Sequence, residues 1–185
     1  MNTIRAGKYE AWVDDVDFIW ASNLTWSFTK IGHKVRGLWR PPKIGGVRAP
    51  THQMSRMIGE RMFGPLPMHI VIDHRNGVTL DNRRGNLRLA TFTLNSLNRV
   101  VSCTKKTGLP LGVTFQPFKS PYLARIMVSG RSRYLGSYST IAEAKQAYDD
   151  ALARYIKVEE QTAVDEVQRF QRGLKTLADC VQARH

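Results

Sequence analysis

The chain has 185 residues, of which 28 are lysine or arginine and 15 are aspartate or glutamate, giving a formal net charge of +13 at pH 7. This excess of positive charge indicates a polyanionic partner, a nucleic acid or an acidic membrane, and disfavours an enzyme that acts on small neutral substrates. Cys103 and Cys180 are far apart and unaccompanied, which excludes a paired-cysteine zinc site and predicts reduced thiols.

The first segment, residues 1–50, predicts a small β-rich scaffold. Short strands are expected over residues 9–13 and 26–29, with a helical turn over residues 14–20 between them. Residues 41–46 contain Pro-Pro and Gly-Gly pairs and therefore predict a loop. We expect this scaffold to pack against the segment that follows.

A helix and a strand are predicted next. Residues 53–63 carry methionines and an isoleucine at helical spacing, and we expect this stripe to pack behind an alternating strand over residues 68–72. The strand runs into Asp73 and His74, which alternation turns to opposite faces. His69 lies about 13 Å from Asp73 along a strand of about 3.3 Å per residue, so we assign it a structural role.

The residues that follow this strand include side chains that could bind a metal ion or activate a water. Residues 75–85 form a turn-rich loop, a short second strand follows over residues 86–90, and a helix then carries Asn95. Strand, loop, strand and helix would bring Asp73, His74 and Asn95 to one point. Two oxygen donors and an imidazole are what a hard divalent cation and an activated water require.

Four arginines lie in the sequence around this predicted site: Arg75, Arg83, Arg84 and Arg88. A run of arginines is usually only a solvated face. Beside a metal site, however, the same residues fit a phosphate clamp, because guanidinium groups bind phosphate oxygens in pairs.

Several short motifs of this stretch occur in a recognisable order. They are Asp73-His74, Asn76-Gly77, residues 80–83, residues 86–88, and Asn95. In this order they resemble the HNH nuclease module in the version found in phage and intron-encoded homing endonucleases. One departure lies in the upstream helix, where the family usually places a histidine and this chain has Ser55.

The resemblance implies a metal-dependent phosphodiester hydrolase of ββα-metal fold. Asp73 and Asn95 would hold one Mg²⁺ or Mn²⁺ ion, His74 would act as the general base, and Asn86 would tie the loop down through bonds to the backbone. We therefore expect a site-specific DNA endonuclease of homing type that nicks one strand per active site. The alternatives are a DNA-binding regulator with an inactive module and a structure-selective nuclease; Asp-His beside Asn-Gly also occurs as a simple hydrogen-bonded turn.

A second unit, residues 111–158, is expected after a linker over residues 101–110. Three strands are predicted, over residues 112–116, 122–128 and 131–138, with Ser129-Gly130 as a tight turn. Residues 140–143 form a capping box that opens a helix. We expect the helix to cover one face of a three-stranded antiparallel sheet.

The other face of this sheet carries basic and aromatic residues. Those expected on it or at its edges are Gln116, Phe118, Lys119, Arg125, Arg131, Arg133 and Tyr134. Gly112-Val113, residues 124–126 and Leu135-Gly136, with an alanine-tyrosine helix, resemble the APETALA/ethylene-response-factor DNA-binding domain. The resemblance implies that the sheet reads a groove of double-stranded DNA.

The chain as a whole is predicted to be α+β. It would comprise an HNH domain with its scaffold (1–100, motif 68–99), the linker, the sheet-and-helix domain and a separate amphipathic helix in 159–185. We expect the helix to pack back on its own chain as a monomer, with dimerisation through residues 162–181 as the alternative. No apolar run approaches the ~18 residues of a membrane span, so we expect a cytoplasmic phage or mobile-element protein acting in the host cell.

Overall fold

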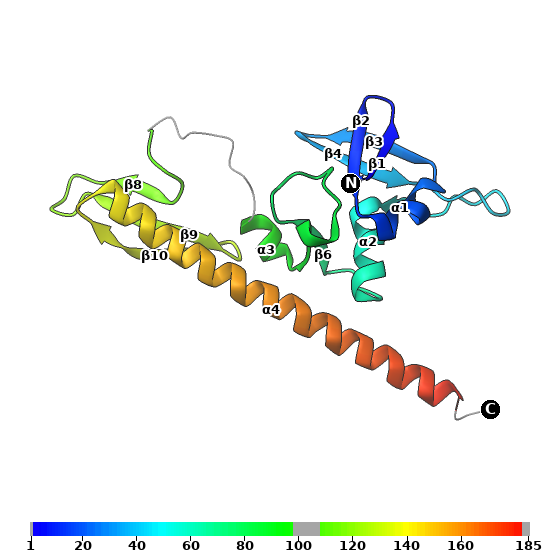
Figure 1. Ribbon diagram of the computed structural model, residues 1–185. Coiled ribbons are helices and arrows are strands. Elements are labelled where there is room, and N and C mark those ends of the chain that lie inside the picture. Colours follow the sequence, from blue (N-terminus) through cyan, green and yellow to red (C-terminus); the bar gives the residue numbers. More distant parts are fainter. Residues whose placement is uncertain (1, 98–107, 183–185) are drawn as a thin grey trace. The chain divides into compact units, whose positions relative to one another are not determined.

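The computed structural model describes residues 2–97 and 108–182 (Figure 1). It comprises two compact units: Met1–Ala90 with Val164–His185, and Thr91–Ala163. Most of the predicted linker, residues 101–107, lies outside the described residues, so the structure does not test it. Within the described ranges, no helix is both long and apolar enough to cross a membrane.

The N-terminal part of the first unit is β-rich, as predicted. Its elements are β1 (Asn2–Ala6), β2 (Tyr9–Val13), α1 (Asp15–Ser22), β3 (Trp26–Ile31), β4 (Lys34–Trp39) and β5 (His52–Gln53). The first two strands form an antiparallel hairpin, and the last three form a sheet in the order β3-β4-β5. The sequence did not predict β1 and β4. Their polar residues are half-buried, so these segments lack the apolar-polar alternation that indicates a strand.

The elements that carry the candidate site follow. They are α2 (Met54–Phe63), β6 (Val71–His74), the 3₁₀ turn η1 (Arg84–Asn86) and β7 (Leu87–Ala90). β6 and β7 form an antiparallel pair, and α2 packs on β6. A side chain at Gly59 would meet Ile72 at 2.4 Å, so this glycine allows the helix to lie close to the strand.

The strand before the site begins later than predicted. β6 starts at Val71 rather than at residue 68, because the Ile70 amide bonds the Pro67 carbonyl at 3.2 Å in a turn. Met68 is 95% exposed in that turn. Arg56 of α2 holds the segment by donating to the carbonyls of Ile70 and, at 2.6 Å, Leu66.

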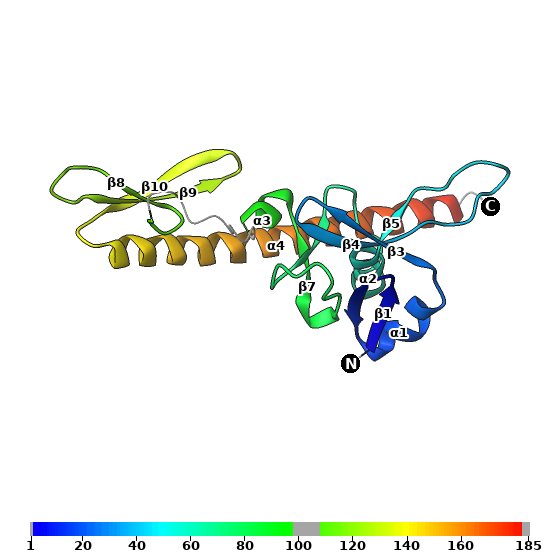
Figure 2. The ribbon, with the colours of Figure 1, turned by 90° about the horizontal axis from the view of Figure 1, so that it is seen from above.

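An apolar cluster supports the first unit from inside. Its buried members are Ile4, Ala11, Val13, Ala21, Trp26, Met54, Ile58 and Leu87. They come from β1, β2, α1, β3, α2 and β7, so one core joins the scaffold to the strand that follows the loop. α2 lies against β4 and β5 (Figure 2). Removal of any one of these large side chains would leave a cavity in a close-packed interior.

The second unit contains α3 (Phe92–Leu97), β8 (Val113–Phe115), β9 (Tyr122–Val128) and β10 (Arg131–Tyr138). The sheet is antiparallel in the order β10-β9-β8, which confirms the predicted three strands. Ser129 and Gly130 both have positive φ, of 49° and 74°, as a two-residue hairpin turn requires. Buried residues of β9, among them Ala124 and Ile126, pack on Ala144 and Tyr148 of the following helix.

That helix, α4 (Ile141–Gln182), is a single helix of 42 residues. The predicted capping box is present, with Thr140 Oγ1 and the Glu143 amide 3.2 Å apart. The prediction of a separate helix after residue 159 was wrong. Residues 157–162 contain neither proline nor glycine, and Thr162 Oγ1 donates to the Val158 carbonyl at 2.9 Å, so nothing ends the helix there.

The last part of α4 belongs to the first unit and contacts the turn before β6 and the end of α2, while the expectation of a monomer stays a prediction. Glu166 Oε2 lies 3.0 Å from His69 Nε2, and Gln171 donates to the carbonyl of Phe63 at 2.6 Å. Val167 is buried, whereas Leu177 is 65% exposed. His69 thus contacts the last part of α4 from the turn before β6, and not from the strand along which its distance to Asp73 was predicted.

Candidate functional site

Asp73 and His74 are the last two residues of β6 and are both buried. In the β6–β7 ladder they lie opposite Arg88 and Leu87. The ladder fixes the backbone of both residues, so the loop that follows begins from a rigid end. The strand ends at His74, whose carbonyl accepts the Gly77 amide at 2.9 Å in the predicted Asn-Gly turn.

The Asp73 carboxylate is held by Arg88. Its Oδ2 accepts bonds from Nε of Arg88 at 3.0 Å and from Nη2 at 2.9 Å. Arg88 is only 6% exposed, so the prediction that it clamps a phosphate does not agree with the structure. The register places this guanidinium across from Asp73, and a buried charge needs a partner of opposite sign. Arg88 thus orients the carboxylate.

His74 is placed by Asn82, which lies eight residues later in the loop. Its Nε2 is 3.2 Å from the Asn82 side-chain oxygen, and Asn82 is 1% exposed. The hydrogen bond to the Asn82 side chain therefore holds the orientation of the ring.

The surroundings of His74 keep it neutral. Burial lowers the pKa of His74, and the hydrogen bond to Asn82 and the charges of Asp73 and Asp81 offset this only in part. A neutral imidazole can accept a proton, which is what a general base does. The same shift makes folding less favourable as the pH falls through about 6.5, because the unfolded chain then takes up a proton that the folded chain refuses.

Asn86 closes the loop between the two strands. Its side-chain oxygen accepts the Asn76 amide at 3.1 Å, and its Nδ2 donates to the Asp81 carbonyl at 2.7 Å. The Arg75 amide in turn bonds the Asn86 carbonyl at 2.9 Å. These are side-chain-to-backbone bonds of the kind expected for Asn86, and they hold the two sides of the loop together.

Two further loop arginines are bonded to carboxylates. Arg83 forms a bidentate pair with Asp81, with both N···O distances at 2.7 Å, and Arg84 bonds both oxygens of Asp17 at 2.6 and 3.0 Å. Asp17 belongs to α1 and is also bonded by Arg61 at 3.0 Å. Burial raises the pKa of Asp17, but the guanidinium groups of Arg84 and Arg61 outweigh it and leave the pKa lowered.

The phosphate clamp expected from the four arginines is therefore largely replaced by internal ion pairs. Arg83 and Arg84 brace the loop, and Arg75 is the exposed arginine of the set. The sequence alone does not reveal Asp17 as a partner, because it lies 67 residues before Arg84. Nor does it assign a role to Asn82, although Asn82 belongs to the matching stretch 80–83.

Asp73 is the carboxylate at this position that could give an oxygen ligand to a divalent cation. In the described part of the chain, no group of three or more His, Cys, Asp or Glu side chains is arranged to hold a metal ion. One carboxylate, Asp73, stands at the strand end, and Mg²⁺ commonly binds through one or two carboxylates together with substrate phosphate. Asn95 lies exposed on α3, in the other unit, and its approach to Asp73 stays a prediction.

The sheet of the second unit divides its predicted DNA contacts between two faces. Tyr134 is opposite Arg125 in the register, and both are exposed on the face away from α4. Arg131 and Arg133 are opposite Val128 and Ile126, whose side chains are buried under α4. The structure therefore places Arg131 and Arg133 on the helix side of the edge strand.

Three other predicted contacts lie beyond the end of β8. Phe118 is 69% exposed and Lys119 is exposed, while Gln116 is half-buried and its amide bonds the Pro121 carbonyl at 2.7 Å. These residues form the turn from β8 to β9. They therefore lie outside the three paired strands.

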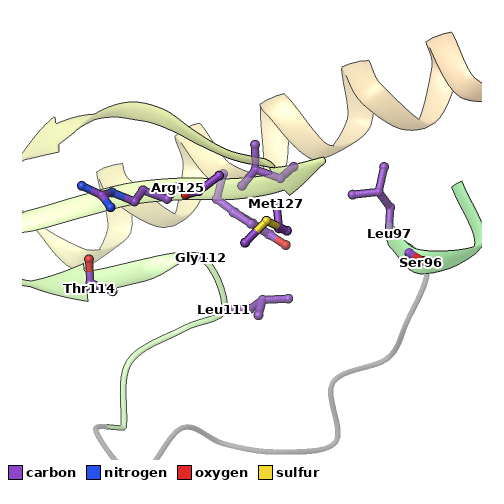
Figure 3. Close-up of a pocket in the computed structure, with 10 residues that line it drawn as sticks. Ser96, Leu97, Leu111, Gly112, Thr114, Arg125 and Met127 are labelled. Carbon is purple, nitrogen blue, oxygen red and sulfur yellow. The ribbon is translucent and has the colours of Figure 1, made fainter. Parts of the chain in front are cut away.

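A hollow of about 330 Å³ lies beside the same face of the second unit. Figure 3 shows Leu97, Leu111 and Met127 pointing into it, with Arg125 extended away from them. Met127 is 60% exposed, so an apolar side chain stands next to the exposed guanidinium in β9. A surface that combines a cation with apolar and aromatic groups suits base edges and methyl groups in a DNA groove.

Comparison with known proteins gives one match. Residues 52–97 match the family model described as HNH endonuclease, and this range includes α2, Asp73, His74, Asn82, Asn86 and Asn95. No curated protein and no solved structure matches the chain. The match supports a DNA endonuclease, a class of nuclease that generally uses a divalent metal. Ser55, which stands where the family usually has histidine, is buried in α2.

Proposed function

We propose that this chain, which contains an HNH endonuclease domain at residues 52–97, is a site-specific DNA endonuclease of the homing type. It would nick one strand of double-stranded DNA per active site with one divalent ion, Mg²⁺ or Mn²⁺. The observation that carries the proposal is the Asp73-His74 pair at the end of β6, oriented by Arg88 and Asn82 inside the matched domain.

In this mechanism the neutral His74 removes a proton from the attacking water. The water oxygen bonds to phosphorus, the bond from phosphorus to the 3′ oxygen breaks, and the leaving 3′ oxygen takes a proton from solvent, so the products carry 5′-phosphate and 3′-hydroxyl ends. Asp73 and Asn95 would hold the metal ion, which when bound neutralises charge on the phosphate and on the leaving oxygen. Asn86 keeps the loop closed, so His74 keeps its position during the reaction.

The second unit would supply affinity and register on the DNA, as an APETALA-like domain. The support for this role is the outer face of its sheet, where Arg125 and Tyr134 are paired across the strands and exposed. Arginine can bond guanine bidentately in the major groove, and lysine or arginine contacts to phosphate add affinity that weakens with salt. The protein would act as a monomer in the cytoplasm of a host cell.

One observation favours a second candidate, a DNA-binding regulator with an inactive nuclease module. The buried guanidinium of Arg88 donates hydrogen bonds to the Asp73 carboxylate, so a metal ion would compete with it for this ligand. A regulator would bind duplex DNA tightly and leave it intact in the presence of any divalent metal.

Supercoiled plasmid incubated with the full chain separates the two candidates. The endonuclease proposal expects conversion to nicked circles in Mg²⁺ or Mn²⁺, none in EDTA, and 3′ ends that a polymerase can extend. Plasmids carrying a broad sequence library provide the target. Tight binding in a gel-shift assay with every plasmid left intact would contradict the proposal and support the regulator.

A further inference from the structure

The segment between β4 and β5 contains a small hairpin that the proposed mechanism does not use. The amide of Ile44 bonds the Val47 carbonyl at 3.2 Å, and the Val47 amide bonds the Ile44 carbonyl at 3.0 Å. Gly45 and Gly46 between them have positive φ, of 58° and 80°, as a two-residue turn with two left-handed positions requires. The sequence analysis predicted a loop here, and the structure makes it an ordered turn.

The base of this hairpin is held by the sheet. Trp39 and His52 are partners in the β4–β5 ladder, with ring centroids 5.6 Å apart. Arg40 Nε then lies 3.4 Å from Thr51 Oγ1 across the stem. Pro41-Pro42 on one side and Pro50 on the other limit the backbone above this bond. Figures 1 and 2 show the segment extending outward from β4 and β5.

The tip of the hairpin presents apolar side chains to solvent. Ile44 is 81% exposed and Val47 is 72% exposed. Lys43 and Arg48 flank them, both are exposed, and neither makes an ion pair with a residue that the structure describes. Two large aliphatic side chains on a narrow, preorganised turn between two cations form a wedge with a positive rim. Neither aliphatic side chain belongs to the apolar core of the first unit.

We propose that this wedge, Ile44 and Val47, inserts between base steps of duplex DNA from the minor groove, while Lys43 and Arg48 contact the adjacent phosphates. Proteins that bend DNA in this way insert aliphatic or aromatic side chains, partly unstack a step and kink the duplex. The cations supply the phosphate contacts that such an insertion needs. The inference rests on the proposed function, namely that this chain acts on double-stranded DNA.

Duplex DNA is the partner that the surroundings favour. The matched nuclease domain begins at residue 52, the residue that closes the stem, and β5 leads directly into α2. Hairpin and nuclease therefore belong to one unit, and a wedge there would act on the DNA that the nuclease holds. Flexible steps such as TA and CA kink most easily, so the wedge would add sequence preference without a hydrogen bond to a base.

Unwinding of a relaxed plasmid tests the proposal without knowledge of the target site. The full chain is bound to plasmid in EDTA, which stops metal-dependent nicking, and a topoisomerase that needs no metal relaxes the DNA before the protein is removed. The wild-type chain is expected to leave a reduced linking number, because an inserted wedge unstacks and unwinds a step. The I44A/V47A double variant is expected to lose most of this change and to bind about tenfold more weakly.

The matched control is V16A/I19A, which removes an exposed valine and isoleucine from α1 in the same unit. It is expected to unwind DNA as the wild-type chain does. Unwinding that is equal in I44A/V47A and wild type would overturn the proposal, as would a gel shift by the wild-type chain with no change in linking number. Binding to phosphatidylserine vesicles that I44A/V47A loses, with DNA unwinding unaffected, would also overturn it in favour of a membrane contact.

Parallel nicking assays in Mg²⁺ keep this outcome separate from the proposed function. Nicking without unwinding would overturn the wedge and leave the endonuclease standing. Unwinding without nicking in any divalent metal would support the wedge on a DNA-binding regulator. Failure of every duplex to shift would overturn both.

Discussion

Arginine serves opposite purposes in two regions of this chain. In the loop between β6 and β7 and the strand after it, guanidinium groups are bonded to carboxylates of the same unit: Arg88 to Asp73 and Arg84 to Asp17. On the outer face of the β8–β10 sheet, Arg125 is exposed and forms no salt bridge to any residue in the described ranges. The loop thus uses arginine in ion pairs that hold the candidate site, and the sheet leaves Arg125 exposed to solvent.

The comparison shows why charge alone does not identify a binding surface. The loop and the strand after it carry Arg75, Arg83, Arg84 and Arg88, whereas the outer face of the sheet carries Arg125, so a count of positive residues ranks the loop first. The difference depends on whether an acidic residue lies within reach in the folded chain. Buried carboxylates such as Asp17 and Asp73 attract their arginines inward, because an unpaired charge in the interior is costly.

The largest expected effect on stability comes from breaking the buried pair. Arg88→Ala leaves Asp73 buried without its guanidinium and should lower the free energy of unfolding of the first unit by about 3–5 kcal/mol. All four tryptophans, Trp12, Trp20, Trp26 and Trp39, lie in this unit, so their fluorescence in a urea titration reports its unfolding.

The control is the exposed pair of Arg5 and Glu10 in the same unit, which have N···O 2.7 Å apart. Arg5→Ala should change the free energy of unfolding by no more than about 1 kcal/mol, since solvent screens exposed ion pairs. An Arg88→Ala midpoint equal to that of Arg5→Ala would show that Arg88 does not stabilise the loop. The proposed difference between the ion-paired arginines of the loop and the exposed arginine of the sheet would then be wrong.

A smaller effect, on DNA rather than on folding, is expected for the sheet. Arg125→Ala should cost about 1–3 kcal/mol of discrimination at one base position and leave the urea midpoint nearly unchanged, because the side chain is exposed. Binding is measured on a library of duplexes at several salt concentrations. Arg131→Ala, on the helix side of the sheet, is the matched control and should not alter base preference. Equal weakening on every duplex would make Arg125 a phosphate contact instead.

The smallest expected effect is a displacement of the pH dependence. The pKa of His74 is lowered by burial, so the acidic limb of the nicking rate should lie below the value of about 6.5 typical of histidine. Asn82→Asp places a carboxylate beside Nε2 of His74 and favours the imidazolium, so the limb should move to higher pH. The rate at alkaline pH should be retained. An unmoved limb would mean that His74 is not the group that titrates.

Local signals predicted much of the fold. The hairpin of β9 and β10 follows from Ser129-Gly130, and the start of α4 follows from Thr140 and Glu143, since turns and caps are set by neighbouring residues. The tie formed by Asn86 also lies within one loop. By contrast, α4 continues through residues 157–162 because no proline or glycine lies there. A missing stop signal is harder to recognise in a sequence than a turn or a cap.

Long-range pairings account for most of what the sequence analysis missed at the site. Asp17 binds Arg84, which lies 67 residues later, and no sequence pattern in either segment indicates this ion pair. Asp73 lies opposite Arg88 only in the observed β6–β7 register. The sequence does not predict that register, because it does not predict where β6 begins. The short β1 and β4 strands gain their stability from neighbours rather than from their own composition.

The central claim is that His74 acts as the base of a metal-dependent nuclease, and one comparison tests it most directly. Plasmid nicking in Mg²⁺ is measured for the wild-type chain, for His74→Ala and for His69→Ala, whose histidine lies in the preceding turn and contacts Glu166. We predict that His74→Ala loses about 10²–10⁴-fold in rate with DNA binding retained, and that His69→Ala nicks nearly as fast as wild type. Nicking by His74→Ala at the wild-type rate would contradict the account.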